Sequence, residues 1–199
     1  MLVFNDLKSF MRSLMRYIGN GYTECQISLI KEKKREEHLL KKIDAKLSKK
    51  YLSTLSQGQR QYRKRKGLCN YIVLRYRTFV YVVLKTSKGE DTLKESWSSI
   101  YNNPIKVGEV LELVIFKDER NKNTVKINKK LFKEIRTSIR LAIEKRDGRR
   151  FHMELKKLHN LSKILSYRGL NMQISSLLKD IKEWQKKHGT KWEVPTFFR

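Results

Sequence analysis

Acidic side chains are absent from a long central stretch of this sequence. Residues 45–89 contain no Asp or Glu, while twelve Lys and Arg side chains fall in the same stretch. Folded proteins usually intersperse the two signs of charge, because like charges repel each other. The formal net charge of +26 at pH 7 strengthens the pattern. A basic stretch without acids is typical of proteins that bind a polyanion, and it indicates nucleic acid as the partner.

Cysteine, proline, glycine and long apolar runs are also scarce. Cys25 and Cys69 are far apart and show no zinc-ligand spacing, so we expect free, buried thiols and a reducing compartment. Two Pro and nine Gly favour regular secondary structure. No apolar run approaches the roughly 20 residues of a membrane span, and residues 1–19 do not read as a signal peptide. We expect a cytoplasmic protein, associated with the nucleoid or with a nucleoprotein complex, and no membrane contact.

Enzyme motifs are few. There is no Gly-rich phosphate loop and no closely spaced His pair. A divalent-metal site needs two or three convergent carboxylates, but the acids cluster only at 90–95, 109–112 and 118–119. Glu112 and Lys117 lack the one-residue spacing found in many nucleases. We predict no metal, no cofactor and no catalytic residue, with a metal-dependent nuclease as an alternative.

Apolar periodicity predicts helices on both sides of a central β region. The helical ranges are 7–18, 33–51, 131–146, 149–167 and 171–187, with breaks at 147–148 and Gly169. The strand ranges are 22–30, 70–85, 110–117 and 124–128, with a hairpin loop over 118–123. We predict one α+β domain over 1–199, an antiparallel sheet of about three to five strands packed with helices. Its parts are a helical region over 1–66, a β region over 67–130 and a helical region over 131–199.

The two faces of the predicted strand over 70–85 differ in kind. One face is almost wholly apolar and should face a core. The other face mixes rings with cations, in the order Tyr71, Val73, Arg75, Arg77, Phe79, Tyr81, Val83 and Lys85. Aromatic rings stack on bases and cations neutralise phosphates, so Arg75, Arg77, Phe79 and Tyr81 are candidate contacts to nucleic acid. In the alternative, helices cover this face and its rings belong to the core.

The densest basic run lies just before this strand. We expect a basic loop over 60–66, whose candidate phosphate contacts are Arg60, Arg63, Lys64, Arg65 and Lys66. A solvated, unspecific loop and a localisation signal are the alternatives.

A second basic cluster lies on the predicted C-terminal helices, and its candidate DNA contacts are Arg136, Arg140, Arg149 and Arg150. The last two helices could form a helix-turn-helix unit that enters a major groove, or simply pack together. We expect the tail over 192–199 to dock through its aromatic residues.

Taken together, these features predict a basic nucleic-acid-binding protein without enzymatic activity. The favoured reading is a DNA-binding accessory factor for replication, mobilisation or defence of a mobile element, working beside protein partners in a nucleoprotein complex. An RNA-binding component of a ribonucleoprotein is the main alternative.

Overall fold

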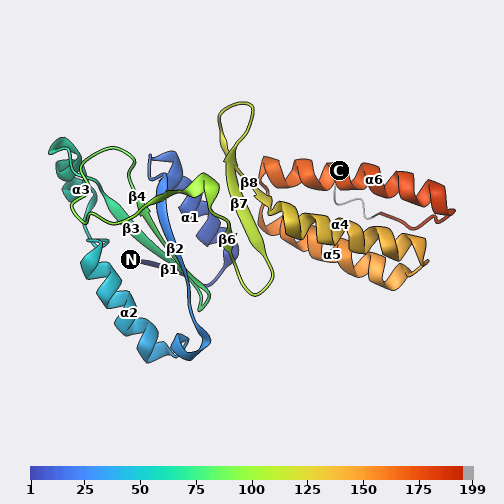
Figure 1. The fold of residues 1–199 in the computed structure, drawn as a ribbon, viewed down its shortest axis with the longest axis horizontal. Helices are drawn as coiled ribbons and strands as arrows, with labels where there is room; N and C mark the ends of the chain where they lie inside the picture. Colours follow the sequence, from blue (N-terminus) through green and yellow to red (C-terminus); the bar gives the residue numbers. More distant parts are fainter. Residues whose placement is uncertain (195–199) are drawn as a thin grey trace. The chain divides into compact units, whose positions relative to one another are not determined.

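The computed structural model describes residues 1–194. These residues form six α-helices and two mostly antiparallel sheets, which confirms the predicted α+β class. The chain divides into two compact units, Met1–Ile115 and Phe116–Arg199, here called unit 1 and unit 2 (Figure 1). Whether the two units fold as a single domain is not tested by this division, so the single domain stays a prediction.

Unit 1 is built on a five-stranded sheet. Its elements are β1 (Leu2–Phe4), α1 (Leu7–Gly19), β2 (Glu24–Leu29), α2 (Glu37–Lys50), α3 (Gln57–Arg65), β3 (Tyr71–Tyr76), β4 (Val80–Lys85) and β5 (Ser98–Ser99). The strand order is β1-β3-β4-β2-β5, and only the β1–β3 pair is parallel. The predicted start of α1 is confirmed, since the Asp6 carboxylate accepts the Ser9 N–H at 2.8 Å and caps the helix.

The stretch predicted as one strand over 70–85 is a β-hairpin. β3 and β4 pair antiparallel, with Arg75 opposite Tyr81 and Leu74 opposite Val82. Arg77 turns the chain with a φ of 47°, a left-handed conformation that the sequence does not signal, because no Gly or Asn stands in this turn. Paired residues share a face, and the turn leaves the alternation in register. The prediction of one strand was therefore wrong, while its division into two faces is correct.

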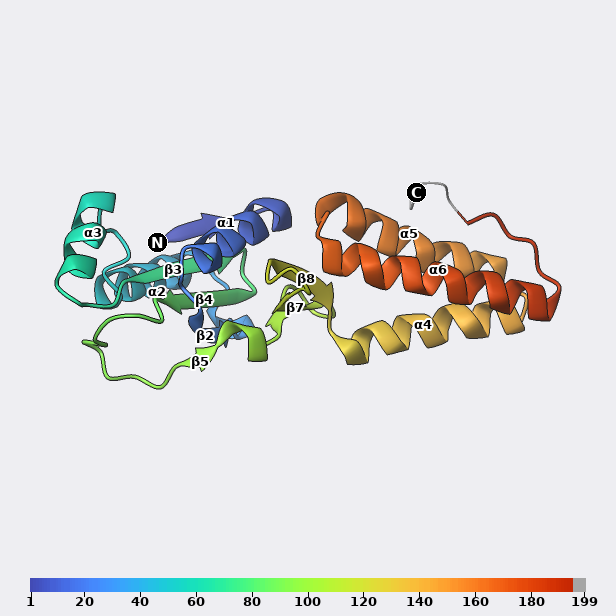
Figure 2. The same ribbon diagram turned by 90° about the horizontal axis from the view of Figure 1, so that it is seen from above.

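Helices of unit 1 cover both faces of this hairpin. α1 packs on the apolar face, where the Phe10 ring lies 5.3 Å from the Tyr76 ring, and Figure 2 shows α1 alongside β3. α2 covers the opposite face, where Leu40 joins a buried cluster with Tyr71 and Tyr81. The two cysteines are buried and free, as predicted.

A second, smaller sheet has the order β6-β7-β8, and the division between the units falls within β7. Its strands are β6 (Ile105–Lys106), β7 (Glu112–Lys117) and β8 (Asn123–Ile127). The predicted hairpin loop over 118–123 is confirmed, since the Asp118 N–H donates to the Lys122 carbonyl at 2.9 Å. The three predicted C-terminal helices are α4 (Lys129–Glu144), α5 (Gly148–Ile164) and α6 (Arg168–His188).

Within unit 2, α6 is tied to β8. The Gln173 side chain accepts the Ile127 N–H at 2.8 Å and donates to the Ile127 carbonyl at 3.0 Å. Gly169 was predicted as a helix break, but it lies inside α6 and is buried. Its lack of a side chain serves packing instead, because a Cβ would approach the Phe116 ring to 2.6 Å.

The tail after α6 docks in the part that the structure describes. The Trp192 ring lies 5.0 Å from the Phe151 ring, and the Gln185 amide donates to the Trp192 carbonyl at 2.9 Å. The remainder of the predicted docking segment, 195–199, lies outside the described residues.

Candidate nucleic-acid interface

The mixed aromatic and basic face of the hairpin is not open. The Tyr81 side chain is 5% exposed, and its hydroxyl donates to Asp44 Oδ1 at 2.7 Å. Arg75 Nη2 donates to Asp44 Oδ2 at 3.0 Å. Burial raises the pKa of Tyr81, and its bond to the Asp44 carboxylate adds to the rise. Arg75 and Tyr81 therefore hold α2 on the sheet, which is the alternative expectation of a face covered by a helix.

Arg77 and Phe79 lie in the hairpin turn and remain accessible. Arg77 Nε donates to the Asn5 carbonyl at 2.6 Å. Phe79 carries the Arg35 guanidinium 5.5 Å from its ring centroid and lines a pocket of about 350 Å³. The same pocket is lined by Glu32 and Glu109 as well as by Lys31, Arg35 and Lys106, so both signs of charge are interspersed there.

The basic run over 60–66 is helical through Arg65, so the expected loop was wrong. α3 starts at a capping box in which the Ser56 and Gln59 side chains bond each other's backbone N–H groups. It ends before Gly67, whose φ of 71° stops the helix. The helix sends its cations in different directions, because consecutive residues lie on different sides of it.

Arg63 takes a structural position. Its Nε and Nη2 donate to the Cys69 carbonyl at 3.2 and 2.8 Å, which fixes the chain just before β3. Arg65 and Lys66 are exposed, and the Lys66 ammonium lies 5.8 Å from the Tyr62 ring centroid. Of these three predicted contacts, only Arg65 and Lys66 are free to meet a phosphate.

Arg60 and Lys64 line a pocket of unit 1 with a volume of about 690 Å³, here called the basic pocket. Arg16 from the end of α1 and Lys88 from the segment after β4 complete its cations. None of the fourteen residues that line the basic pocket is Asp or Glu. Three of the four cations, Arg60, Lys64 and Lys88, come from the acid-free stretch of the sequence.

Backbone hydrogen bonds join the segments that wall the basic pocket. The turn after α1 meets the segment after β4, where the Ser87 N–H donates to the Gly21 carbonyl at 3.1 Å. Asn70 joins α3 to the same segment, since its Nδ2 donates to the Arg60 carbonyl and its N–H to Thr86 Oγ1, both at 3.0 Å. These bonds fix the backbone that carries the cations before any ligand binds, which favours binding.

Two tyrosine rings lie in the wall of the basic pocket. Tyr17 and Tyr22 meet edge to face with centroids 5.4 Å apart, and the Arg16 guanidinium lies 5.2 Å from the Tyr17 centroid. Burial raises the pKa of the Tyr22 phenol, while the Arg60 charge acts to lower it. Tyr22 is therefore neutral at pH 7 and adds no negative charge to the pocket.

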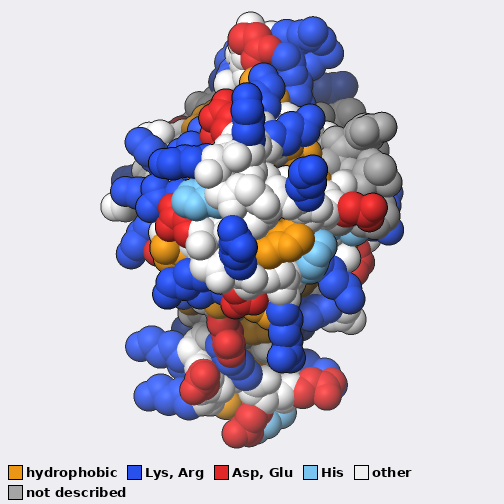
Figure 3. All heavy atoms as spheres, turned by 90° about the vertical axis from the view of Figure 1, so that its right-hand side faces the viewer, with side chains coloured by type: hydrophobic (Ala, Val, Ile, Leu, Met, Phe, Trp, Pro, Cys, Tyr) orange, Lys and Arg blue, Asp and Glu red, His pale blue; other side chains and the backbone are white. Residues whose placement is uncertain are grey.

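The predicted DNA contacts of unit 2 do not form a comparable site. Arg136 Nε pairs with Asp180 Oδ2 at 2.8 Å, and Arg140 lies 3.4 Å from Glu144 Oε1. Arg150 Nε donates to Ser138 Oγ at 3.1 Å, whereas Arg149 is exposed. The face of the molecule in Figure 3 likewise carries Lys and Arg over much of its area with Asp and Glu scattered among them.

The last two helices do not have the geometry of a helix-turn-helix unit. That motif needs two helices that cross steeply, whereas α5 and α6 lie alongside each other in Figures 1 and 2. Leu165 and Ile174 are buried in unit 2. Plain helix packing, the alternative expectation, describes this pair.

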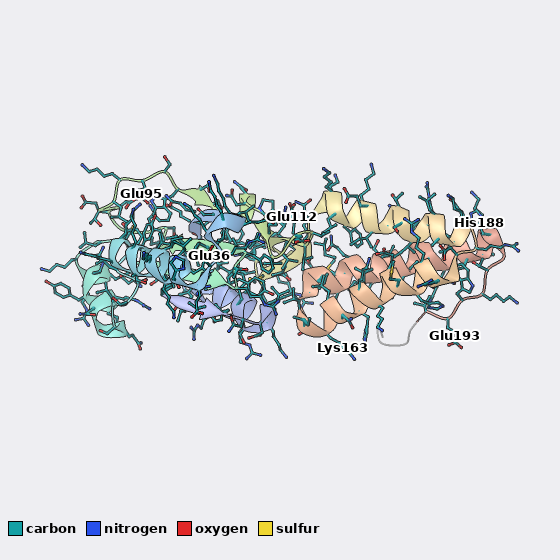
Figure 4. The ribbon with its side chains drawn as sticks, turned by 90° about the horizontal axis from the view of Figure 1, so that it is seen from below. Glu36, Glu95, Glu112, Lys163, His188 and Glu193 are labelled. Atoms are coloured by element: carbon teal, nitrogen blue, oxygen red, sulfur yellow. The ribbon has the colours of Figure 1, made fainter. Side chains whose placement is uncertain are left out.

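The carboxylates do not gather into a metal site in the part of the chain that the structure describes. Figure 4 shows Glu95 and Glu112 well apart in unit 1. No helix within residues 1–194 is long and apolar enough to cross a membrane. No family model, curated protein or solved structure matches this chain.

Sequence reasoning missed Arg16 and Lys88. Arg16 stands on a helix predicted only to build the core, and Lys88 stands in a turn after the clearest β signal. Lys88 belongs to the acid-free stretch, whereas Arg16 lies outside it and is marked only by the Gly-containing turn at 19–21 that follows it. The pairing of β2 with β4 brings these two turns together, and no local pattern reveals that pairing.

Proposed function

We propose that this protein binds nucleic acid through the basic pocket and does not catalyse a reaction on it. One observation supports this function above the others, namely that four cations from three separate elements line one pocket without any acid. Phosphates neutralise such a cluster and release their counterions on binding, which drives association. A cluster that served only solubility would be interspersed with acids, as the pocket around Phe79 is.

The remaining lining of the basic pocket suits a nucleotide. The amides of Asn20, Gln57 and Gln61 are exposed at its wall and offer donors and acceptors to a base. The Tyr17 ring offers a stacking surface that tolerates any base. DNA is the partner we favour over RNA, and an accessory role in replication, mobilisation or defence, with protein partners in a cytoplasmic nucleoprotein complex, is part of the proposal.

The test is a variant in which the exposed cations of the pocket lose their charge, Arg16→Gln with Lys64→Gln and Lys88→Gln. Arg60 is left in place because its backbone and side chain both hold the pocket wall. We expect weaker binding to single-stranded DNA and a slope of log K against log salt that is smaller by about 2, from 0.7 per phosphate contact. Fluorescence anisotropy over a salt series measures both.

The matched control removes three exposed cations of unit 1 that do not line the basic pocket, with Lys33→Gln, Lys34→Gln and Lys46→Gln. An equal loss of affinity in both variants would show that net charge alone drives binding. Competition among single-stranded DNA, single-stranded RNA and duplex DNA of one sequence identifies the partner, and an advantage for RNA would reject the preference for DNA.

A further inference from the structure

We infer that the basic pocket takes a terminal nucleotide that carries a phosphomonoester, and so recognises the phosphorylated end of a strand. This inference rests on the proposed function and narrows its ligand. It starts from the charge of the pocket. Among the ion pairs of residues 1–194, none involves Arg16, Arg60, Lys64 or Lys88. Arg60 Nη2 donates to the Ser53 carbonyl, which is neutral, so all four cations that line the cavity keep their charge.

A terminal phosphate matches this charge better than an internal one. A phosphodiester inside a strand carries one negative charge, whereas a phosphomonoester carries about −1.5 to −2 at pH 7, because its second pKa is about 6. The end of α1 also borders the pocket, and the helix dipole places about half a negative charge there. The start of α3 at Gln57 supplies about half a positive charge. The two helix ends therefore cancel, and the four cations set the net charge of the pocket.

The size of the basic pocket points to one nucleotide rather than to a duplex. Pockets of roughly 300–1,000 Å³ enclose a drug-sized molecule, and the volume of about 690 Å³ falls within this range. A double helix is read differently, by an element that enters a groove across an open surface. The hairpin face that could have tracked an extended single strand is covered by α2. Of the two unit 1 pockets described above, the basic pocket is the one whose lining holds no carboxylate, so it suits a strand end better.

The base of the terminal nucleotide would meet groups that do not select its identity. The Tyr17 ring is half-buried beside the Arg16 guanidinium, and it stacks on purines and pyrimidines alike. Side-chain amides of Asn20 and Gln61 rotate to offer either a donor or an acceptor. We expect recognition of the phosphorylated end with little sequence preference.

The experiment compares ligands on the unaltered full-length chain, so it does not depend on a variant folding. One single-stranded DNA sequence is prepared with a 5′-phosphate, with a 3′-phosphate, with hydroxyls at both ends, and as a closed circle. We expect a phosphorylated end to bind roughly tenfold more tightly than the hydroxyl form, as a charge-assisted hydrogen bond provides. This advantage should shrink as the pH falls below about 6, where the phosphomonoester takes up a proton.

The variant with Arg16→Gln, Lys64→Gln and Lys88→Gln should lose the advantage of the phosphorylated end, while the control with Lys33→Gln, Lys34→Gln and Lys46→Gln keeps it. Equal affinity for the circle, the hydroxyl form and the phosphorylated forms would overturn the inference and leave the proposed function standing. No binding to any of the four would reject the proposed function itself. Thymidine 5′-monophosphate that binds as tightly as the phosphorylated strand would show that the pocket takes a free nucleotide and would overturn recognition of a strand end.

Discussion

Asp44 binds two residues, Arg75 and Tyr81, that the sequence predicted as contacts to nucleic acid. Its carboxylate accepts hydrogen bonds from the Arg75 guanidinium and the Tyr81 hydroxyl, and the Arg75 and Asp44 side chains are only 13% and 15% exposed. Such a pair adds little net stability when intact, but removing one partner leaves the other charge without compensation. Arg63 is held in a similar way by the Cys69 carbonyl. Arg75 is therefore neutralised within the fold, whereas Arg63 keeps its charge but is fixed in position by the backbone.

The substitution Asp44→Ala should therefore cost stability and leave binding intact. We expect the free energy of unfolding to fall by about 2–3 kcal/mol, because Arg75 loses its ion partner and Tyr81 its acceptor. Urea denaturation measures the change, and Lys46→Ala on the exposed side of α2 should stay within about 0.5 kcal/mol of the unaltered chain. If folded Asp44→Ala lost affinity for nucleic acid, the aromatic and basic face of the β3–β4 hairpin would again be a candidate interface.

At the scale of elements, the segment between β4 and β5 is held by a network of carboxylates. The Tyr71 hydroxyl donates to Asp91 Oδ1 at 2.5 Å, and Lys85 Nζ lies 3.5 Å from Asp91 Oδ2. Glu95 pairs with Lys50 and accepts the Tyr51 hydroxyl at 2.9 Å. The same segment carries Lys88 to the basic pocket, so the network bears on the site as well as on the sheet.

The network predicts a loss of stability in acid. Burial acts to raise the pKa of Asp91 and of Glu95, but hydrogen bonds from Tyr71 and Lys50 respectively, with nearby positive charge, bring each pKa below its ordinary value of 3.8 or 4.5. A carboxylate with a lowered folded pKa stabilises the protein above its unfolded pKa, and this contribution is lost as the pH falls through that value toward the folded pKa. The loss should therefore begin below about pH 5.

Thermal unfolding between about pH 6 and pH 3 measures this dependence. The double variant Asp91→Asn with Glu95→Gln should start less stable near pH 6 and then change less with pH than the unaltered chain. Parallel curves for the two proteins would mean that other carboxylates govern the acid response.

The packing of α6 against Phe116 and β8 within unit 2 gives a second prediction at this scale. In Gly169→Ala the new methyl group would meet the Phe116 ring and the Val125 carbonyl, at 2.6 and 2.8 Å. We expect a loss of about 1–3 kcal/mol, as overpacking usually costs. Gly58→Ala in α3 is the matched control, since nothing lies within 4 Å of its Cβ position and Ala favours a helix by about 0.5–1 kcal/mol. Equal effects on the midpoint of urea unfolding would show that the gap at Gly169 closes without strain.

At the scale of the whole molecule, the net charge of +26 is the dominant fact. Mutual repulsion of the cations destabilises the folded protein, and salt reduces that repulsion because the Debye length shortens to about 10 Å at 0.1 M. We expect the Tm to rise when the NaCl concentration is raised from about 50 mM to about 500 mM.

A nucleic acid should raise the Tm further, at low salt. A ligand at about 100 times its Kd contributes roughly 2.7 kcal/mol, which corresponds to several degrees for a chain of this size. The rise should be smaller in the variant with Arg16→Gln, Lys64→Gln and Lys88→Gln than in its charge-matched control. Differential scanning calorimetry checks both effects, and a Tm that does not respond to the oligonucleotide would contradict the proposed function.

Local patterns predicted the elements well and their surroundings poorly. The helix start at residue 7, the loop over 118–123 and the three C-terminal helices depend on short-range chemistry, and each is observed. The hairpin turn at Arg77 carries no turn residue, so the pattern merged β3 and β4 into one strand. The basic run was predicted as a loop because its dense charge was weighted above the capping box at Ser56, which starts the helix a few residues earlier.

The sequence by itself determined the α+β class, the two faces of the hairpin and the acid-free stretch, because periodicity and charge are properties of neighbours along the chain. Only the tertiary structure decided which cations are used within the fold. Asp44 reaches Arg75 across 31 positions of sequence, and the turn at Gly21 meets Ser87 across 66. Pairings over such distances depend on the order of strands in the sheet, and they bring Arg16 and Lys88 to the pocket that Arg60 and Lys64 line.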